Sequence, residues 1–351
     1  MAYEKFHHVD FTHFSQEKQN PMKITIVGAG LAGVTAAVIL RDAGHAVEVF
    51  ESRDHVGGNC FDEWINGVLV HRYGPHGFHT DNETVWNFLN RFTEFRPTAL
   101  EVVANTPLGV IPVPFNDVSA GLIGDLSPEH IRDLIFRAYS EKHWGIPWEE
   151  VPRSISTRLP ERRRSTDCRY HLDRWQGVPA DGYTCMFEHM LDGVPCHLGC
   201  SPDEWRRFPS DHVVFTGSID EYFGNTHGRL EYRSLDFRYE SEPKRRYFQV
   251  NECNHQNPWT RSVDHSHWLG QQVENTVVGY EHPCEWEPGR VRMYPKAFGP
   301  NPERYKLYRE AASGERNVTF VGRLATYKYL DMDDVIAQVM TKLPYSEAAL
   351  Q

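Results

Sequence analysis

A glycine-rich turn near the N-terminus has the spacing of a nucleotide-binding loop. Gly28, Gly30 and Gly33 form a G-x-G-x-x-G pattern directly after the β-branched run Lys23–Val27, and residues 34–43 continue as an alanine-rich helical stretch. In such a turn the first glycine permits a tight bend, the second lets the backbone approach a pyrophosphate, and the third lets the helix pack closely on the strand. The helix N-terminus offers free N–H groups to the phosphates. The pattern predicts a dinucleotide cradle.

An acidic residue and a second glycine pair extend this cradle. Glu51 follows the run Ala46–Phe50, where a carboxylate can accept hydrogen bonds from both ribose hydroxyls. Gly57 and Gly58 come next, followed by Asn59, and they let bare backbone wrap the pyrophosphate from a second side. The order of strand, glycines, helix, strand and acid is that of a dinucleotide-binding unit, and it does not by itself separate FAD from NAD.

A late strand–glycine–helix unit favours FAD. Residues 318–321 predict a strand that ends in Gly322 and Arg323, and a helix is expected at about 332–343. We expect this unit to return to the first cradle and to hold the flavin end of the cofactor. The sequence therefore predicts an FAD-binding domain assembled from both ends of the chain.

Two aromatic residues lie on a predicted helix with clear start signals. Ser127 is expected as its N-cap and Pro128 as its first residue, and an apolar stripe follows at helical spacing. Tyr139 and Trp144 could extend that stripe. Because Trp144 lies in the polar setting of residues 141–145, we expect it at the surface. A surface aromatic can stack on a nucleobase.

Four arginines cluster in the run RLPERRR, namely Arg158, Arg162, Arg163 and Arg164. Such a run is ordinarily a solvated face. The formal net charge of the chain is −11, so an anionic ligand would need a local cluster of cations rather than a basic surface. Arginine presents a planar, always charged fork that suits a diphosphate. The run is therefore also a candidate diphosphate-binding loop.

Composition limits the remaining function classes. The chain has 351 residues, 40% of them apolar, which allows a packed core and more than one lobe. Its acidic balance argues against nucleic acid and anionic membrane surfaces as partners. Seven cysteines without a Cys-x-x-Cys pair predict a reducing, cytoplasmic setting and no metal site. Residues 1–21 lack the apolar core of a secretion signal, and we expect them to form a polar extension.

Further segments resemble the UDP-galactopyranose mutase family. The similarity follows the family's order from about residue 22 to residue 342. Besides the cradle, it is carried by residues 71–80 (HRYGPHGFHT), 139–145 (YSEKHWG), 174–183 (RWQGVPADGY), 230–235 (LEYRSL), 294–295 (YP) and 322–332 (GRLATYKYLDM). No single segment is specific, whereas their combination is.

The resemblance implies a flavin-dependent isomerase of nucleotide sugars. Members of the family are described as using reduced FAD in a redox-neutral reaction, in which flavin N5 attacks the anomeric carbon of UDP-galactose and the sugar changes between its pyranose and furanose forms. The implied catalytic residues are Arg162, Arg233, His76, Tyr294 and Tyr329. The implied substrate-binding residues are Tyr139, Trp144, Arg158, Arg162, Tyr170, Arg233, Arg261, Tyr294 and Tyr329. The implied cofactor-binding residues are Gly28, Gly30, Gly33, Glu51, Gly57, Gly58, Asn59, His76, Arg323, Asp331 and Met332.

Three alternatives stay open. The same chemistry could act on another nucleotide hexose, such as a deoxy- or amino-sugar. An FAD oxidoreductase of the amine-oxidase type would oxidise its substrate and consume oxygen, and its site would be an aromatic cage rather than a set of arginines and tyrosines. A non-catalytic nucleotide-sugar binder would not need FAD. For the mutase, the expected partners are a UDP-hexose and an external reductant, and a homo-oligomer is left open.

We expect an α/β fold with an FAD-binding Rossmann-like domain, a reduced helical lobe and a mainly antiparallel sheet domain. Alternation through Leu235, Phe237 and Tyr239 predicts a strand of that sheet, and Arg233 and Arg261 are expected on its strands. The predicted boundaries are 1–21 for the extension, 22–116 with 176–224 and 301–345 for the FAD-binding domain, 117–175 for the helical lobe with a mobile arginine loop, and 225–300 for the antiparallel sheet.

Two departures from the family pattern affect these expectations. Gly77 occupies a position where the family usually has a bulky apolar residue, so we expect a more mobile loop. Residues 117–138 replace a region that is usually much longer, and they suffice for a short loop and one good helix. That region normally contributes to subunit contacts and borders the nucleotide pocket, so the oligomeric state and the sugar nucleotide stay open.

Overall fold

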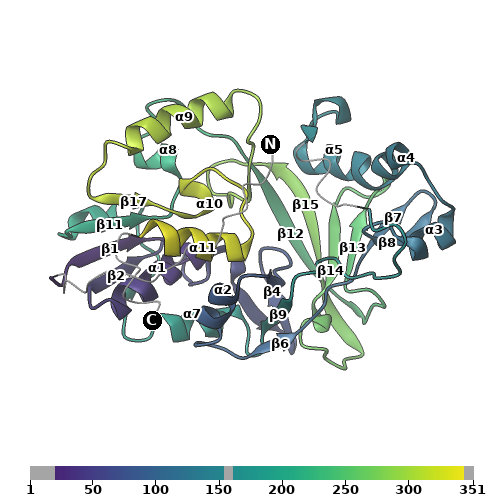
Figure 1. The fold of residues 1–351 in the computed structure, drawn as a ribbon, viewed down its shortest axis with the longest axis horizontal. Helices are drawn as coiled ribbons and strands as arrows, with labels where there is room; N and C mark the ends of the chain where they lie inside the picture. The colour runs from purple at the N-terminus through teal and green to yellow at the C-terminus, as the bar shows by residue number, and fades with distance from the viewer. Residues whose placement is uncertain (1–19, 154–160, 344–351) are drawn as a thin grey trace.

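The computed structural model describes residues 20–153 and 161–343. Its two main sheets lie side by side, and Figure 1 shows the parallel sheet with its helices on the left and the long strands of the second sheet to the right of the centre. This arrangement confirms the predicted α/β class with a mainly antiparallel second sheet. Within the described ranges, no helix combines the length and the apolar character needed to cross a bilayer.

The first sheet is parallel and has the strand order β10-β2-β1-β11-β17. Strands β1 (Lys23–Val27) and β2 (Ala46–Phe50) have the predicted bounds, and the predicted late strand is β17 (Val318–Phe320). The other strands are β10 (Cys196–His197) and β11 (His212–Phe215). Strands covered on both faces carry continuous apolar runs, which is why β1 and β2 could be found from the sequence.

Helix α1 (Leu31–Asp42) lies at the centre of this domain. All of its residues from 31 to 40 are buried, and it packs on β1, on α7 (Tyr183–Met190) and on α11 (Met332–Lys342). Each fully buried large aliphatic side chain contributes roughly 1.5–3 kcal/mol, so this packing holds the glycine turn at the N-terminus of α1 firmly in place. The predicted helices at 34–43 and 332–343 are confirmed within a few residues.

The second sheet has the strand order β16-β12-β15-β14-β13-β7-β8. Its neighbouring strands run antiparallel except for β13 and β7, which are parallel. The strands are β7 (Val102–Thr106), β8 (Gly109–Val113), β12 (Tyr232–Pro243), β13 (Gln249–Glu252), β14 (Arg261–Asp264), β15 (Asn275–Glu285) and β16 (Tyr294–Pro295). Arg233 and Arg261 lie on β12 and β14, as expected.

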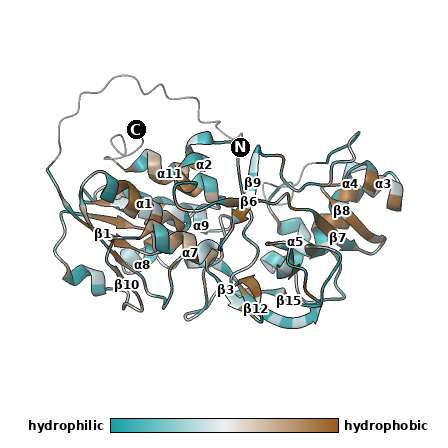
Figure 2. Ribbon diagram, turned by 90° about the horizontal axis from the view of Figure 1, so that it is seen from below, coloured by the Kyte–Doolittle hydropathy of each residue, from teal (hydrophilic) through white to brown (hydrophobic). Residues whose placement is uncertain are grey.

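Two strands from the predicted FAD-binding segment belong to the second sheet, which moves one predicted domain boundary. Strands β7 and β8 fall inside the segment 22–116 that was assigned to the FAD-binding domain, yet β7 pairs with β13, with Val102 opposite Gln249. Figure 2 shows β7 and β8 as an apolar pair near one end of the molecule, and Ile111 and Val113 are buried there against the helical lobe. A strand can be predicted from its own residues, whereas its partner in the sheet cannot.

The reduced helical lobe covers this edge of the sheet. Its first helix begins with a capping box between Asn116 and Ser119 and ends at Gly124, where φ is +90°. Ser127 then caps the next helix as predicted, and one helical segment continues through a π-helical turn to Trp144. Residues 117–144 therefore hold two helical segments, where a short loop and one helix were expected over 117–138. The elements of the lobe are α3 (Asp117–Ile123), α4 (Pro128–Arg132), η2 (Asp133–Arg137) and α5 (Ala138–Trp144).

Two small sheets lie between the main ones. The hairpin is β3 (Asp62–Ile65) with β4 (Val68–His71), and the three-stranded sheet has the order β5 (Phe78–Thr80), β9 (Trp175–Pro179), β6 (Phe95–Pro97). The loop that joins β4 to β5 carries the predicted residue His76. The remaining elements are η1 (Gly58–Cys60), α2 (Glu83–Leu89), η3 (Trp148–Glu150), η4 (Glu204–Arg207), α8 (Ile219–Tyr222), η5 (His265–His267), α9 (Asn301–Ala312) and α10 (Gly322–Ala325).

Leu100 fills the space beside Gly77. A Cβ built on Gly77 would lie 2.4 Å from Leu100 Cδ1 and 3.7 Å from the ring of Trp268. The backbone of Gly77 does not have the positive φ that would require glycine. The missing side chain at position 77 is therefore replaced in space by a leucine from another segment.

We predict that substitutions at Gly77 and Leu100 partly compensate each other. Gly77→Ile should lower the free energy of unfolding by about 1–3 kcal/mol, because the space is already filled. Leu100→Ala should also destabilise the protein, and the double variant should recover about 1–2 kcal/mol relative to the sum of the two losses. Chemical denaturation measures all three values. Strictly additive losses would show that Leu100 does not fill the space of the absent side chain.

Candidate functional site

The first glycine turn brings β1 and α1 together without side chains between them. Gly28 has a φ of +103°, and a Cβ there would lie 2.2 Å from Thr216 Oγ1. A Cβ on Gly33 would lie 1.8 Å from the carbonyl oxygen of Gly28, so only glycine lets the helix approach the strand so closely. This geometry fits the roles predicted for Gly28 in the bend and for Gly33 in packing.

The second glycine pair closes against the first turn. The N–H of Gly57 donates to the carbonyl oxygen of Ala29 over 2.8 Å, and Gly30 and Gly57 form a parallel bridge. A Cβ on Gly58 would lie 2.9 Å from the Cα of Gly30. Bare backbone from two turns therefore meets at one place, which is what a pyrophosphate needs.

Glu51 lies at the carboxyl end of β2, beside the first turn. Its side chain is buried, its Oε2 accepts a hydrogen bond from the N–H of Ala29 at 2.7 Å, and its Oε1 accepts one from the N–H of Arg53 at 2.9 Å. These bonds fix the orientation of the carboxylate and leave lone pairs for other donors. The predicted contact with a ribose is compatible with this geometry and stays a prediction.

Two arginines of the cradle carry buried donors that have no hydrogen-bond partner among the described residues. The donors are Nη1 of Arg53 and both Nε and Nη2 of Arg323. Buried polar groups are normally hydrogen bonded, so these donors fit an anionic group. The Oδ1 of Asn59 accepts from Nη2 of Arg53 at 2.9 Å and orients it. The phosphates of a dinucleotide match this donor set, and Arg53 was missed in the sequence.

The late strand–glycine–helix unit returns to the cradle as predicted. Gly322 has a φ of +87°, and a Cβ there would lie 2.9 Å from the Cβ of Ala32 in α1. Asp331 is the N-cap residue of α11, and the sulfur of Met332 lies 3.7 Å from the sulfur of Cys60 in η1. The N-terminal end of α11 is therefore held next to the second glycine pair.

A wall of arginines and tyrosines joins the second sheet to this cradle. Nη2 of Arg261 donates to the hydroxyl of Tyr294 over 3.1 Å. The rings of Tyr294 and Tyr329 stack with their centroids 5.9 Å apart, and the guanidinium of Arg323 lies 4.6 Å from the centre of the Tyr329 ring. Four of the predicted site residues, which come from distant parts of the chain, are therefore brought together.

Glu281 completes this wall and was missed in the sequence. It lies on β15 opposite Arg261, and its Oε2 accepts from Nε of Arg261 at 2.7 Å. Burial raises the pKa of Glu281, while Arg261 acts in the opposite direction. Burial also opposes the charge of Arg261, but Glu281 holds the pKa of that guanidinium well above its usual value. Only the register of β14 and β15, which the sequence does not reveal, would have identified the pair.

Helix α5 places Tyr139 and Trp144 on the inside of the site. Burial raises the pKa of Tyr139, and the positive charge of Arg261 acts in the opposite direction. Trp144 is buried, so the expectation of a surface aromatic is wrong. Its ring meets Tyr294 and Phe298 edge to face, with centroid distances of 6.4 Å and 5.5 Å. The polar neighbours of Trp144 in the chain gave a misleading signal, because tertiary contacts decide its burial.

The guanidinium of Arg233 donates its hydrogen bonds to other groups of the protein. Its Nε donates to the carbonyl oxygen of His143 over 2.7 Å, its Nη2 donates to that of Lys142 over 3.3 Å, and Nη1 pairs with Glu285. These carbonyls belong to the last turn of α5, where helices leave acceptors unsatisfied. A Cβ on Gly145 would lie 2.9 Å from Nη1 of Arg233. Arg233 therefore fastens α5 to the second sheet, and its predicted contact with a diphosphate stays a prediction.

The arginine run is only partly described. Arg158 lies outside the described residues. Arg162 donates to the carbonyl oxygens of Arg169 and Tyr170, the latter over 2.8 Å, so it lies beside the predicted Tyr170. Arg163 is exposed and pairs with Asp125 and Glu161, as expected for a solvated face.

His76 lies in the loop between β4 and β5. Its Nδ1 is 2.8 Å from the carbonyl oxygen of Gly74, so this nitrogen carries the proton. Burial, together with the charges of Arg323 and Arg261, lowers the pKa of His76 to about 4, although the hydrogen bond to Gly74 acts in the opposite direction. At neutral pH the ring is uncharged and lies near both arginines, which fits a place beside the cofactor and makes it a weak general base.

His79 belongs to a small polar cluster. Its Nδ1 lies 3.3 Å from a carboxylate oxygen of Asp173, and its ring stacks on that of His171 at 3.6 Å. One possible ligand atom from each residue lies within 4.8 Å of the others. Parallel stacked imidazoles do not direct two nitrogen lone pairs at one ion, so the ion pair and the stacking account for this cluster without a metal.

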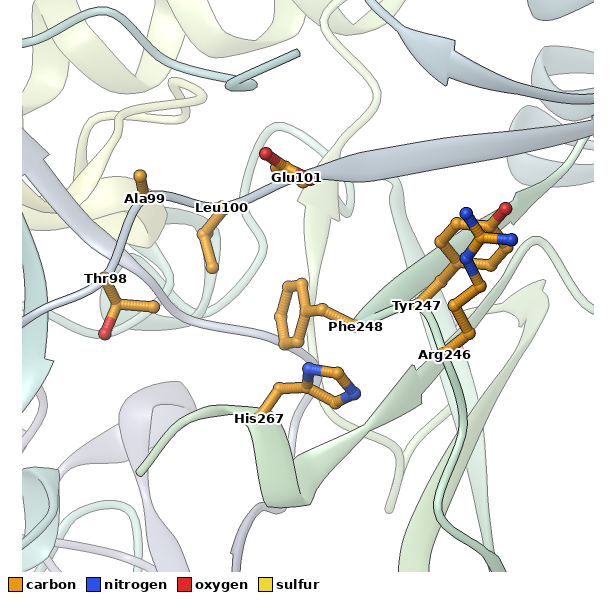
Figure 3. A pocket seen from close by; sticks show the side chains of 8 residues that line it. All are labelled: Thr98, Ala99, Leu100, Glu101, Arg246, Tyr247, Phe248 and His267. Atoms are coloured by element: carbon orange, nitrogen blue, oxygen red, sulfur yellow. The ribbon is translucent and has the colours of Figure 1, made fainter. Parts of the chain in front are cut away.

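A cavity of about 210 Å³ lies at the beginning of β7 and β13 (Figure 3). Figure 3 shows Leu100, Phe248 and His267 pointing toward the same space. The lining residues are Thr98, Ala99, Leu100, Glu101, Arg246, Tyr247, Phe248 and His267. None of them belongs to the predicted site, although Leu100 lies against Gly77, the neighbour of His76, and accepts a hydrogen bond from the backbone of Tyr170.

Comparison with known proteins agrees with this geometry. Residues 134–329 match the family model described as UDP-galactopyranose mutase, and residues 26–92 match that of an NAD(P)-binding Rossmann-like domain. A dTDP-fucopyranose mutase of Escherichia coli is 32% identical over 91% of this chain and 96% of its own length. A probable UDP-galactopyranose mutase of Klebsiella pneumoniae is 33% identical over 92% of this chain and 94% of its own.

Among solved structures, a reduced UDP-galactopyranose mutase superposes with a TM-score of 0.73 at 13% identity and covers 92% of this chain and 93% of its own. Fold and site together define an α/β dinucleotide-binding protein whose second sheet closes over the cradle with arginines and tyrosines. The chain belongs to the UDP-galactopyranose mutase family, a family of isomerases. Membership implies a flavin cofactor and a nucleotide-sugar substrate class.

We predict that Arg233 stabilises the fold as well as the site. Arg233→Lys should lower the free energy of unfolding by about 1–3 kcal/mol, because the carbonyl oxygens at the end of α5 lose buried donors. Arg238→Lys, at an exposed position of the same strand, is the matched control and should change it by less than about 0.5 kcal/mol. Chemical denaturation measures both. Unchanged stability of Arg233→Lys would favour a direct role in ligand binding instead.

Proposed function

We propose that this protein interconverts the pyranose and furanose forms of a nucleotide-linked hexose of the UDP-galactose type. The observation that supports this best is the wall itself, in which Arg261 with Glu281, Arg323, and the phenols of Tyr294 and Tyr329 gather beside the cradle. Cations and neutral donors next to a dinucleotide site suit a second, phosphorylated ligand. Membership in the family supplies the reaction class.

The nucleotide and the sugar are the finer part of the proposal. The relatives from E. coli and K. pneumoniae have nearly equal identity to this chain, and their names give a dTDP-linked and a UDP-linked substrate, respectively. A dTDP-linked deoxyhexose is therefore the second substrate candidate. The shortened helical lobe borders the region where we place the base, so the substrate must be decided by assay.

Reduced FAD is the proposed cofactor. The two glycine turns, Glu51, Arg53 and Arg323 would hold its ribose and pyrophosphate, since the turns are bare and the arginines have unused donors. When bound and reduced, the flavin supplies the nucleophile for the anomeric carbon. An external donor provides the electrons, and the net reaction is redox neutral. The seven free cysteines fit a reducing compartment, which we propose to be the cytoplasm.

The proposed role of the wall is to stabilise the negative charge that develops on the diphosphate as its bond to the sugar breaks. A cation about 4 Å from a phosphate charge contributes about 1 kcal/mol in water and about 4 kcal/mol at an effective dielectric constant near 20. Arg323, whose donors we assign to the cofactor, lies against Tyr329 and adds its positive charge there, whereas Arg261 is neutralised by Glu281. The phenols of Tyr294 and Tyr329 donate hydrogen bonds without adding net charge.

Other parts of the chain would orient the substrate. We place the base near Tyr139, Tyr170 and Trp144, of which the first two pack in one apolar cluster and the third borders Tyr294. Arg158 and Arg162 are proposed to approach the diphosphate from the arginine run. Exclusion of water by this segment would strengthen each charge interaction.

The decisive assay combines purified protein and FAD under anaerobic conditions with dithionite. We expect furanose product from UDP-galactopyranose, or from dTDP-fucopyranose, only when the flavin is reduced, with no oxidant consumed per turnover. Chromatography resolves the two ring forms. Product from the dTDP sugar alone would keep the reaction and change the substrate. Oxidation of the substrate with uptake of oxygen would refute the proposal in favour of an oxidase.

Arg323 offers a test of the cofactor site. Arg323→Met should weaken FAD binding about 10- to 100-fold, because hydrogen bonds to charged groups contribute about 1.5–3 kcal/mol. Arg206→Met, at an exposed arginine on η4 that pairs with Asp203, is the matched control and should leave binding unchanged. Equilibrium titration followed by flavin fluorescence measures both affinities. Equal affinities in the two variants would remove Arg323 from the cofactor site.

A further inference from the structure

A buried histidine holds the backbone of the loop that carries His76. His71, the last residue of β4, is 1% exposed. Its Nδ1 accepts a hydrogen bond from the backbone N–H of His76 at 3.1 Å. The loop is partly buried, and an acceptor inside the protein is favoured there because a buried donor without one costs about 1–3 kcal/mol. The contact therefore fixes the backbone of the loop at His76.

The protonation of His71 follows from this contact. A nitrogen that accepts a hydrogen bond carries no proton, so the neutral ring has its proton on Nε2. Burial, with smaller contributions from His265 and His76, holds the pKa of His71 well below its usual value, and the ring stays neutral. Nε2 lies 4.0 Å from Oδ2 of Asp62. That same oxygen accepts the N–H of Tyr183 at 2.6 Å, so Asp62 is itself fixed at the start of α7.

Packing fixes the orientation of the His71 ring. It stacks on the indole of Trp268 with centroids 4.2 Å apart and planes inclined by 18°. Nδ1 of His265 lies 3.2 Å from Nε1 of Trp268 and 3.3 Å from the backbone nitrogen of His71, and accepts from both. Tilting the ring out of its plane would break this stack, and the hydrogen bond from His76 selects the orientation in which Nδ1 faces the loop.

The other side of the loop contacts the wall. Gly74 has a φ of +91°, and a Cβ there would lie 2.7 Å from Oε1 of Glu281. The second oxygen of Glu281 holds Arg261. The carbonyl oxygen of Gly74 also accepts from Nδ1 of His76. A shift of the loop would therefore press on Glu281 and displace the guanidinium of Arg261 together with it.

We propose that His71 is a positioning residue. Through Nδ1 it holds the backbone of His76, and through the loop it sets the place of the Glu281–Arg261 pair beside the cofactor site. The proposal rests on the proposed function only where it concerns turnover. The hydrogen bond itself can be tested without any assumption about the substrate.

Three substitutions separate an acceptor from a space-filling ring. In His71→Asn the side-chain oxygen can take the position of Nδ1, whereas in His71→Gln the amide extends toward the position of Nε2. His71→Phe keeps a flat ring for the stack on Trp268 and has no acceptor. If His71 mattered for packing alone, phenylalanine would be the best replacement and asparagine the worst. The proposal predicts the opposite order.

The first readout is amide hydrogen exchange of the 72–77 segment in the flavin-loaded protein, followed by mass spectrometry. We expect exchange about tenfold faster in His71→Phe and His71→Gln than in the wild type, since the N–H of His76 loses its acceptor. His71→Asn should keep most of the protection. Thermal unfolding of each variant identifies a global loss of structure. The control His197→Asn, at an exposed histidine beside Glu48, should exchange like the wild type.

The second readout is the midpoint potential of the bound flavin together with kcat and KM. We expect His71→Phe and His71→Gln to shift the potential and to lower kcat more than they change KM, and His71→Asn to restore both toward the wild type. Equal protection of the 72–77 segment in all three variants would overturn the proposal. Absence of mutase turnover in the wild type would instead refute the proposed function and leave the exchange result valid.

Discussion

The buried ion pair between Arg261 and Glu281 is the interaction on which the site depends. It lies between two strands of the second sheet and places a guanidinium within hydrogen-bond reach of Tyr294. Loss of Arg261 would leave the buried carboxylate of Glu281 uncompensated, at a cost of about 3–5 kcal/mol. The pair therefore fixes the face that the second sheet presents to the cradle, and Tyr329 and Arg323 complete that face from the other domain.

The cradle depends on a different constraint, the absence of side chains. At Gly33 and Gly58 even a single Cβ would meet backbone atoms at less than 3 Å. Such constraints are local, because the glycines lie within a few residues of the strands and helix that they join. This is why the sequence predicts β1 and β2 at their observed bounds and locates the late unit at 318–343 almost as well.

Long-range register explains what the sequence could not reveal. Glu281 becomes a partner of Arg261 only when β14 and β15 pair. Trp144 has polar neighbours in the chain and is buried by Tyr294 and Phe298, which follow about 150 residues later. The resemblance to a family brought Arg261, Tyr294 and Tyr329 into one predicted site, but it carried no information on which guanidinium is already neutralised.

The distribution of charge decides how the wall can act. Arg261 is neutralised by the buried Glu281, so its guanidinium adds orientation and hydrogen bonds rather than net positive charge, whereas Arg233 shares the exposed Glu285 with Lys296. The unused buried donors that we find in the cradle belong to Arg53 and Arg323. The chain has a formal charge of −11. The positive charges of Arg53 and Arg323 attract an anion to the cradle locally, while repulsion from the rest of the surface limits the binding of anions elsewhere. The phenols of Tyr294 and Tyr329 lie between the second sheet and the cradle. Their hydrogen bonds to a diphosphate can strengthen as its negative charge grows, while the phenols themselves stay un-ionised.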